Sequence, residues 1–241
     1  MRLQFFCTIT YYKKILNVGG NSVWHYPLMQ SLDKIHAILK SGREQLTFDN
    51  NSLTFSLLDF WRWSVSDILS NATRGRFAEF IVATATNIDI TIVREEWSEY
   101  DLITPDKIKL EIKSSAYLQS WAQKKLSAIS FSTKAHRLDN ITGKHNEMPK
   151  RHADVYVFCL LHHENKQTVN PFDLNQWSFY ALATKDLNDY TRSQHSITLK
   201  SLQRLTHPVI YNELNNEIQR KYSLNLIDIG QEDNIASSKF D

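Results

Sequence analysis

Residues 107–113 read KIKLEIK, the clearest strand signal in the chain. Apolar and charged residues alternate strictly in this heptapeptide, and successive side chains of a β-strand point to opposite faces. The pattern therefore predicts a strand with one buried face and one charged face. Glu111 and Lys113 share the charged face, with attachment points roughly 6.5 to 7 Å apart.

The neighbouring segments extend this strand into a sheet. Residues 100–104 form a candidate preceding strand, and the Thr104-Pro105-Asp106 turn predicts that the two strands form a hairpin. Residues 153–161 (ADVYVFCLL) are almost continuously apolar, which is typical of a central strand covered on both faces. Residues 177–183 are its expected neighbour. Further short strands are expected at 88–93, which is rich in β-branched residues, and at 127–132.

Apolar residues at helical spacing recur on both sides of these strands. Residues 71–86 predict a buried helix, in which Glu79 is the only charge of the apolar stretch FAEFIVATA. Other helices are expected at 27–39, 52–69, 199–205 and 210–218. The expected fold class is α/β (α+β), with a mixed central sheet flanked by helices. We expect one domain over 1–241, with a core at about 71–184, helical flanks at 1–70 and 185–230 and a polar tail at 231–241.

Composition limits the functional classes. The chain has 28 lysines and arginines against 26 aspartates and glutamates, and its net charge of +2 does not by itself indicate a nucleic-acid-binding protein. The two cysteines form no CxxC pair, which favours a reducing cytoplasm. Polar residues interrupt the apolar N-terminus, so we expect neither a signal peptide nor a membrane span. The expectation is a soluble, cytoplasmic protein.

A metal site is the chemistry that the predicted hairpin suggests. If its two strands pair through the Pro105 turn, Asp101 lies next to Glu111, and two adjacent carboxylates attract a hard cation such as Mg²⁺. The backbone carbonyl of Ile112 and water can complete the coordination. A bound cation of this kind favours phosphodiester cleavage, in which Lys113 would orient the attacking water or stabilise the phosphorane.

Glu79 supplies independent support for a charged site. A lone carboxylate in an apolar helix is costly to bury unless it is paired, hydrogen-bonded or directed towards a metal. We therefore expect Glu79 to support the metal site, through water or through a neighbouring ligand.

In this order, with Glu79 on a helix, Asp101 on a strand and Glu111-Ile112-Lys113 on the next strand, the chain resembles the PD-(D/E)XK (restriction-endonuclease-like) superfamily. The resemblance covers residues 71–183. It implies a mixed sheet flanked by helices and Mg²⁺-dependent hydrolysis of nucleic acid, most often DNA, with Mn²⁺ as a substitute cation. Tyr100 occupies the place of the proline in the motif, a position that varies within the superfamily.

A basic, polar segment follows the motif and is a candidate surface for nucleic acid. Lysine and arginine can contact phosphates, and aromatic side chains can stack on bases. Two arginines at the start of the 71–86 helix can also contact phosphate, although a capping or ion-pairing role fits them equally well. The candidate nucleic-acid-binding residues are Arg74, Arg76, Tyr117, Gln119, Lys124, Lys125, Lys134 and Arg137.

Three functional hypotheses remain open at this level. The first is an endonuclease that acts on DNA in restriction, defence or repair, and a homodimer is an open alternative because many double-strand cutters need two sites. The second is a nuclease-fold module that binds nucleic acid or a protein partner without cutting it. The third makes the charged face of 107–113 a solvated strand face, which predicts that Asp101 and Glu111 lie far apart.

Overall fold

The computed structural model describes residues 17–18, 21–22, 34–96, 98–138 and 145–224. Its contacts divide the chain into two units, Met1–Ala37 and Ile38–Asp241. The described part of the first unit contains the antiparallel pair β1 (Asn17–Val18) and β2 (Asn21–Ser22). The expected core and the described parts of its two flanks from residue 38 onward all belong to the second unit.

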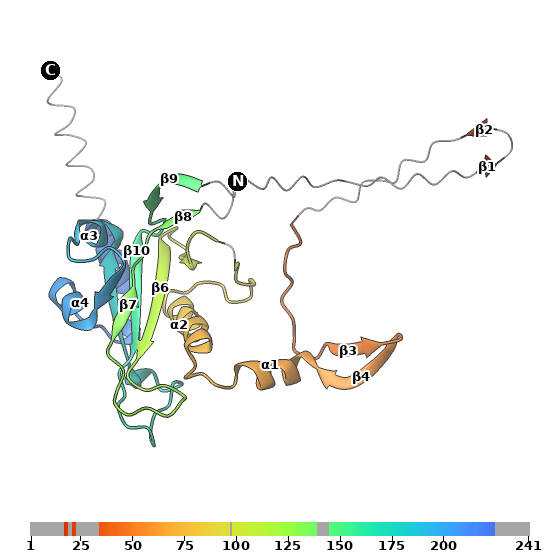
Figure 1. Cartoon of the computed structure of the whole chain (residues 1–241), viewed down its shortest axis with the longest axis horizontal. Helices are drawn as coiled ribbons and strands as arrows, with labels where there is room; N and C mark the ends of the chain where they lie inside the picture. Colours follow the sequence, from red (N-terminus) through yellow and green to blue (C-terminus); the bar gives the residue numbers. More distant parts are fainter. Residues whose placement is uncertain (1–16, 19–20, 23–33, 97, 139–144, 225–241) are drawn as a thin grey trace, which may run out of the picture. The chain divides into compact units, whose positions relative to one another are not determined.

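A mixed four-stranded sheet forms the centre of the second unit, as the sequence predicts (Figure 1). Its strand order is β11-β10-β6-β5, with β5 at Leu102–Ile103, β6 at Lys109–Ala116, β10 at Val155–Leu161 and β11 at Trp177–Ala183. β6 pairs with β10 in parallel, whereas β5 with β6 and β10 with β11 are antiparallel. Every residue of β10 is buried, which confirms its expected central position.

Helix α2 (Asn71–Ala85) and the helical residues 214–224 cover one face of this sheet. The predicted apolar face of 107–113 points to this side, because Ile108, Leu110 and Ile112 pack in one core with Ala78, Ile81 and Val82 of α2. The buried helix expected at 71–86 is thereby confirmed.

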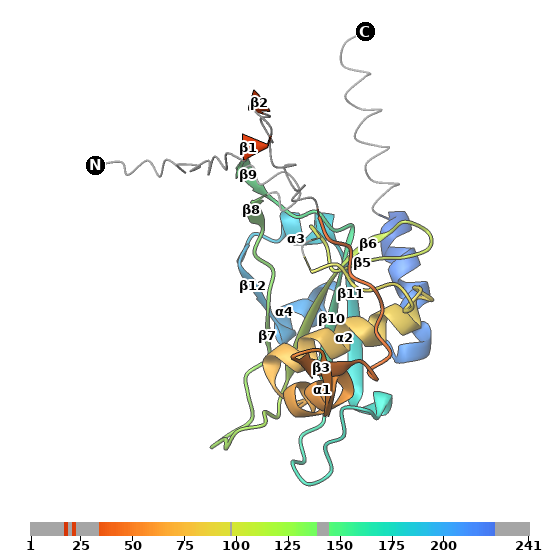
Figure 2. The same ribbon diagram turned by 90° about the vertical axis from the view of Figure 1, so that its right-hand side faces the viewer.

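The opposite face of the sheet has its own core and its own helices (Figure 2). Side chains of β10 and β11 pack there against α3 (Thr184–Asp189), α4 (Leu199–Leu205) and the two-stranded sheet of β7 (Ser130–Ser132) and β12 (Ser196–Thr198). Two 3₁₀ turns, Leu174–Gln176 and Tyr211–Glu213, connect the elements. The predictions of a strand within 127–132 and of a helix at 199–205 are therefore confirmed.

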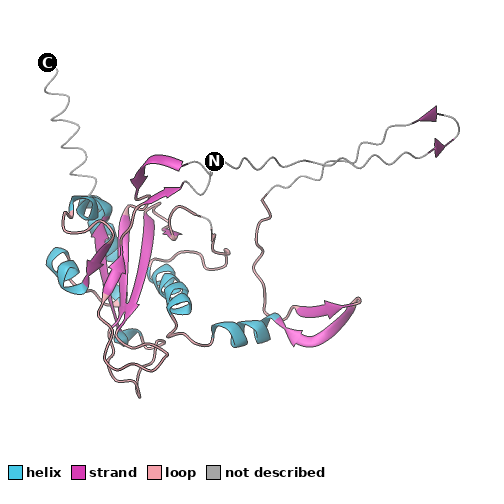
Figure 3. Ribbon diagram, in the orientation of Figure 1, coloured by secondary structure: helices cyan, strands magenta, loops and turns pink. Residues whose placement is uncertain are grey.

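The N-terminal flank differs from the expected helices (Figure 3). Strands β3 (Gln45–Phe48) and β4 (Asn51–Ser56) form a hairpin, and only α1 (Leu57–Val65) is helical within the segment expected to be a helix at 52–69. The turn residues Asp49 and Asn50 have positive φ angles of 48° and 62°, a backbone conformation typical of tight hairpin turns. This segment fits the alternation of a strand as well as the spacing of a helix, because its apolar residues lie at positions 53, 55, 57, 58, 60, 61 and 63. The double fit explains why a single helix was wrongly predicted at 52–69.

Two other expectations fail in the described residues. Residues 88–93 form turns and bends instead of a strand, since no neighbouring strand offers them a ladder. Residues 34–39 carry no helix, and the rest of the predicted 27–39 helix lies outside the described residues, as does the polar tail. The basic segment contains the hairpin of β8 (His136–Leu138) and β9 (His145–Lys150). Among the described residues, no helix is long and apolar enough to span a membrane.

Candidate active site

The β5–β6 hairpin brings Asp101, the residue just before β5, to the edge of the strand that carries Glu111 and Lys113. Leu102 pairs with Leu110 in the antiparallel ladder, and Asp101 lies one residue beyond the end of this ladder. The Asp101 backbone N–H donates to the carbonyl of Leu110 (3.0 Å), and one Asp101 carboxylate oxygen accepts from the Ile112 N–H (2.7 Å). The side chain of Glu111 is only 12% exposed, which does not favour the hypothesis of a simply solvated strand face.

Glu111 and Lys113 project from the face of β6 that lies away from α2. The Lys113 ammonium donates to a Glu111 carboxylate oxygen at 2.5 Å, and both side chains are largely shielded, with exposed fractions of 27% and 12%. Tyr156 stands beside Glu111 in the parallel ladder. Burial raises the pKa of the Tyr156 hydroxyl and the charges of Glu111 and Asp101 raise it further, while Arg151 acts in the opposite direction.

Glu79 reaches the same region from helix α2, on the opposite side of the sheet. Its carboxylate forms an ion pair with the guanidinium of Arg94, which bonds both carboxylate oxygens. Arg94 also donates to Glu96 at 2.9 Å. Burial raises the pKa of Glu79 and the charge of Asp101 adds to the effect, while Arg94 acts in the opposite direction. The ion pair with Arg94 therefore explains how a carboxylate can be accommodated in this apolar helix.

Asp101 lies between the two halves of the predicted quartet. Its charge acts on Glu79 and Arg94 on one side of the sheet and on Tyr156 on the other. Over the part of the chain that the structure describes, His, Cys, Asp and Glu side chains form no group of three arranged to hold a metal ion. The cation ligands expected from the sequence, Asp101 and Glu111 with the Ile112 carbonyl, therefore stay a prediction, and they fit the one or two carboxylates that commonly bind Mg²⁺ together with water and phosphate.

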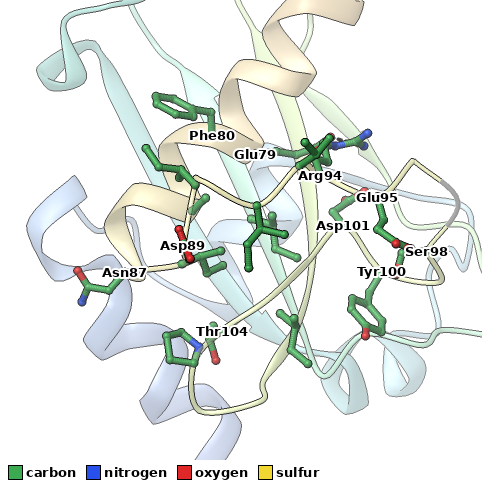
Figure 4. Close-up of a pocket in the computed structure, with 18 of the residues that line it drawn as sticks. Glu79, Phe80, Asn87, Asp89, Arg94, Glu95, Ser98, Tyr100, Asp101 and Thr104 are labelled. Atoms are coloured by element: carbon green, nitrogen blue, oxygen red, sulfur yellow. Dashed lines mark hydrogen bonds and ion pairs between the residues drawn. The ribbon is translucent and has the colours of Figure 1, made fainter. Parts of the chain in front are cut away.

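A pocket of about 760 Å³ opens beside Asp101 (Figure 4). Glu79 and Arg94 lie together at one end of it, next to Asp101, and Tyr100 lies on the side of Asp101 away from them. The walls are mostly apolar and come from the segment before β3, from α2, from the 88–98 loop and from the β5 hairpin: Leu39, Phe80, Ala83, Ile88, Ile90, Ile92, Val93, Leu102, Ile103 and Pro105. Lys109 places its ammonium 5.4 Å from the centre of the Tyr100 ring, a cation–π contact at the edge of the site.

The two arginines at the start of α2 have different environments. Arg74 is only 3% exposed, and its guanidinium donates to the Leu69 carbonyl (2.7 Å), to Asn71 (2.7 Å) and to Ser114 (3.3 Å) and Gln119 (3.3 Å). These contacts join α2 to β6 and to the chain that follows β6. They favour a structural role for Arg74 over the phosphate contact that the sequence also allowed. The side chain of Arg76 is 62% exposed and lies 3.6 Å from Glu96, and it also borders the pocket.

The other candidate nucleic-acid-binding residues lie in or after the chain that leaves β6. Gln119 is buried and its amide donates to the Ala116 carbonyl (3.0 Å), so it orients this chain from within. Tyr117 is half-buried, and burial raises the pKa of its hydroxyl. Lys124, Lys125 and Lys134 are exposed, and Arg137 lies in β8. Lys124 and Lys125 follow the C-terminal end of β6, whereas Asp101 and Glu111 lie near its start.

Arg94 and Tyr156 are site residues that the sequence analysis did not identify. Arg94 lies 15 positions from its partner Glu79, in a segment that reads as the end of a strand. Tyr156 belongs to an apolar run in which an aromatic residue reads as core. The strict register of β6 with β10 is the one signal that could have placed Tyr156 beside Glu111.

The mixed central sheet flanked by helices is an α+β architecture, which is consistent with a nuclease-like fold. Residues 52–201 match the sequence model of the bacteriophage T4 endonuclease IV family, a match that covers more than half of the chain. The chain therefore belongs to this family, and its class is that of the endonucleases, which cleave nucleic acid. No curated protein matches the sequence significantly.

Proposed function

We propose that this protein is a divalent-metal-dependent endonuclease of the PD-(D/E)XK type that hydrolyses phosphodiester bonds in DNA. The observation that supports the proposal is the hydrogen bond of the Asp101 carboxylate to the backbone of β6, the strand on which Lys113 is paired with Glu111. The order of these residues along the chain matches the motif of that superfamily. Membership of an endonuclease family supports the reaction class.

The proposed roles follow from the geometry. Asp101 and Glu111 hold the cation, together with the carbonyl of Ile112, the residue that follows Glu111. A bound Mg²⁺ would neutralise charge on the phosphate and lower the pKa of a bound water. Lys113 donates a hydrogen bond to the attacking water or to a phosphoryl oxygen.

Glu79 and Arg94 support the site electrostatically in this proposal. Arg94 sets a positive charge against the carboxylates of Glu79 and Glu96 beside Asp101. An enclosed acidic cluster without such a counter-charge would oppose its own ionisation. Glu79 therefore acts through water or through its neighbours, in agreement with its weaker expected role.

A cleavage assay tests the proposal. Single-stranded and duplex DNA and RNA are incubated with the full chain in Mg²⁺, in Mn²⁺ and in a chelator. We expect DNA cleavage that needs the cation and that Asp101→Ala and Lys113→Ala each abolish. Cleavage that survives both substitutions contradicts the assigned site. If no substrate is cut, calorimetric titration with Mn²⁺ separates an enzyme lacking its substrate from a binding module, which need not hold a cation at Asp101 and Glu111.

A further inference from the structure

Residues 38–66 form a local unit, here called the N-terminal arm, that is well built internally and buries almost nothing. The helix α1 begins with a reciprocal capping box, in which the Ser56 N–H donates to Asp59 (2.8 Å) and the Asp59 N–H donates to the Ser56 hydroxyl (3.4 Å). The backbone of α1 is also bonded to the chain before β3, through Leu58 N–H to the Gly42 carbonyl at 2.8 Å.

Gly42 shows how closely this arm is packed within itself. Its φ angle is +87°, and a Cβ atom at this position would lie 3.0 Å from the ring of Trp61. The chain can therefore turn against α1 only because residue 42 is glycine. Such a specific arrangement indicates a defined unit, and yet α1 contains no buried residue and β3 and β4 are exposed along nearly their whole length.

The exposed side chains of the arm are large and apolar. Leu46 and Phe48 alternate with polar residues in β3, as Leu53 and Phe55 do in β4, so each strand has one apolar face. Helix α1 adds more, and Trp63 is 84% exposed. From β3 to the end of α1 the set, with exposed fractions between 36% and 84%, is Leu46, Phe48, Leu53, Phe55, Leu58, Phe60, Trp61, Trp63 and Val65.

The area of these nine side chains matches the need of a protein interface. With aromatic side chains of about 150 to 250 Å² each, the set exposes roughly 800 Å² of apolar surface. A standard interface takes about 800 Å² from each partner, whereas exposed patches on monomers are usually about 300 to 600 Å². A lone two-stranded hairpin is also only marginally stable in water, so the arm needs a cover for its apolar side chains.

The net charge of the arm indicates which kind of partner can cover it. Residues 38–66 contain three cations (Lys40, Arg43, Arg62) and three anions (Glu44, Asp49, Asp59), a net charge of zero. A neutral surface rich in Trp, Phe and Leu offers no attraction to nucleic-acid phosphates or anionic lipid. A two-fold contact between identical surfaces, by contrast, sets apolar side chains against apolar side chains and requires no complementary partner.

We propose that the N-terminal arm is the dimerisation surface of this protein and that a second copy of the same chain covers it. Its aromatic side chains, Trp63 and Phe60 above all, act as the anchors of the contact, since buried aromatic residues contribute most to such interfaces. This proposal is independent of the metal site and of the cleavage reaction.

Sedimentation analysis of the full chain tests the proposal. We expect wild-type protein at micromolar concentration to have twice the 28.1 kDa mass of one chain. Trp63→Asp should weaken the dimer at least 100-fold, and Phe48→Asp in the hairpin should do the same if Trp63→Asp disturbs α1. Trp121→Asp is the matched control, because Trp121 is 54% exposed outside the arm, and it should leave the dimer unchanged. Circular dichroism and the unfolding midpoint confirm that each variant is folded.

The other outcomes overturn the proposal. A wild-type chain that stays monomeric at tens of micromolar means that the arm is covered by its own chain or by a foreign partner. A dimer that persists in folded Trp63→Asp and Phe48→Asp means that another surface holds it. Dimers that form only with DNA present would assign the arm to nucleic acid.

Discussion

The carboxylate of Asp101 accepts a 2.7 Å hydrogen bond from the backbone N–H of Ile112, the residue between Glu111 and Lys113. This bond fixes Asp101 to the strand that carries the Glu-x-Lys pair and replaces the ladder at the point where β5 begins. One carboxylate oxygen of Asp101 is therefore used to accept the backbone N–H. The side-chain amide oxygen of an asparagine could accept this hydrogen bond as well. Charge and structure at this position can therefore be separated by mutation.

Asp101→Asn should remain folded and lose its activity. The asparagine oxygen can accept from the Ile112 N–H, while the negative charge that attracts a cation is gone. We expect DNA cleavage to fall about 100-fold or more, equivalent to roughly 2.7 kcal/mol of activation free energy, with little change in the unfolding midpoint. Asp106→Asn in the following turn is the control and should retain activity. Wild-type cleavage rates in Asp101→Asn would remove this residue from the site.

Lys113→Met should separate cation binding from catalysis. The ammonium of Lys113 neutralises Glu111 across 2.5 Å, so its removal takes away a positive charge that competes with a bound cation for this carboxylate. We expect Mn²⁺ affinity, measured by calorimetry, to be equal to or tighter than that of wild type. Single-turnover cleavage should fall about 100-fold. Lys107→Met, at an exposed position of the same hairpin, is the control for the loss of one positive charge. Loss of Mn²⁺ binding in Lys113→Met would argue against a role of Lys113 in catalysis alone.

Arg74 and Arg76 provide a matched pair for stability. Replacing the buried Arg74 with methionine leaves the Leu69 carbonyl and the Gln119 amide without their donor. We expect the free energy of unfolding to fall by roughly 2 to 3 kcal/mol, as for other buried polar groups that lose their partner. Arg76→Met should change it by less than about 0.5 kcal/mol. Urea denaturation measures both, and equal losses would show that the Arg74 network contributes nothing specific.

His162 gives a prediction for pH dependence. Burial, and then the neighbouring His163, lowers the pKa of His162, and its ring is 2.9 Å from the Ser178 hydroxyl. Because the folded chain resists protonation more than the unfolded chain, wild type should lose stability as the pH falls below about 6.5, the ordinary histidine value. His162→Gln cannot undergo this titration. Urea midpoints at pH 8 and pH 5 should therefore diverge between the two proteins, and parallel changes would refute the assignment.

The sequence predicts the core of this fold because burial and period agree there. The alternation in 107–113 and the apolar run of β10 each allow one arrangement, and the structure confirms both. The apparent strand at 88–93 fails because β-branched residues favour a strand only where a neighbour completes the ladder. The β3–β4 hairpin was missed because Leu53, Phe55 and Trp61 fit helical spacing as well as alternation.

The candidate site residues also fall into two groups: those that local sequence patterns predict and those that depend on long-range packing. Glu111 and Lys113 follow from the period of a single strand, and Asp101 follows from one hairpin turn. The partner of Glu79 depends on how the 88–98 loop packs on α2, and local spacing carries no information about that contact. The burial of Arg74 likewise depends on Gln119, 45 positions away. Sequence reasoning therefore finds the residues of a site more readily than the counter-charges that hold them.

The most direct test of the metal site is an anomalous scattering measurement on crystals of the full chain soaked in Mn²⁺. We predict an anomalous peak within about 2.5 Å of carboxylate oxygens from both Asp101 and Glu111. The same crystals of Asp101→Asn should show the peak lost or strongly reduced. A protein that cleaves DNA while its Mn²⁺ peak lies elsewhere, or while no peak is present, would contradict the assignment of these two carboxylates as the cation site.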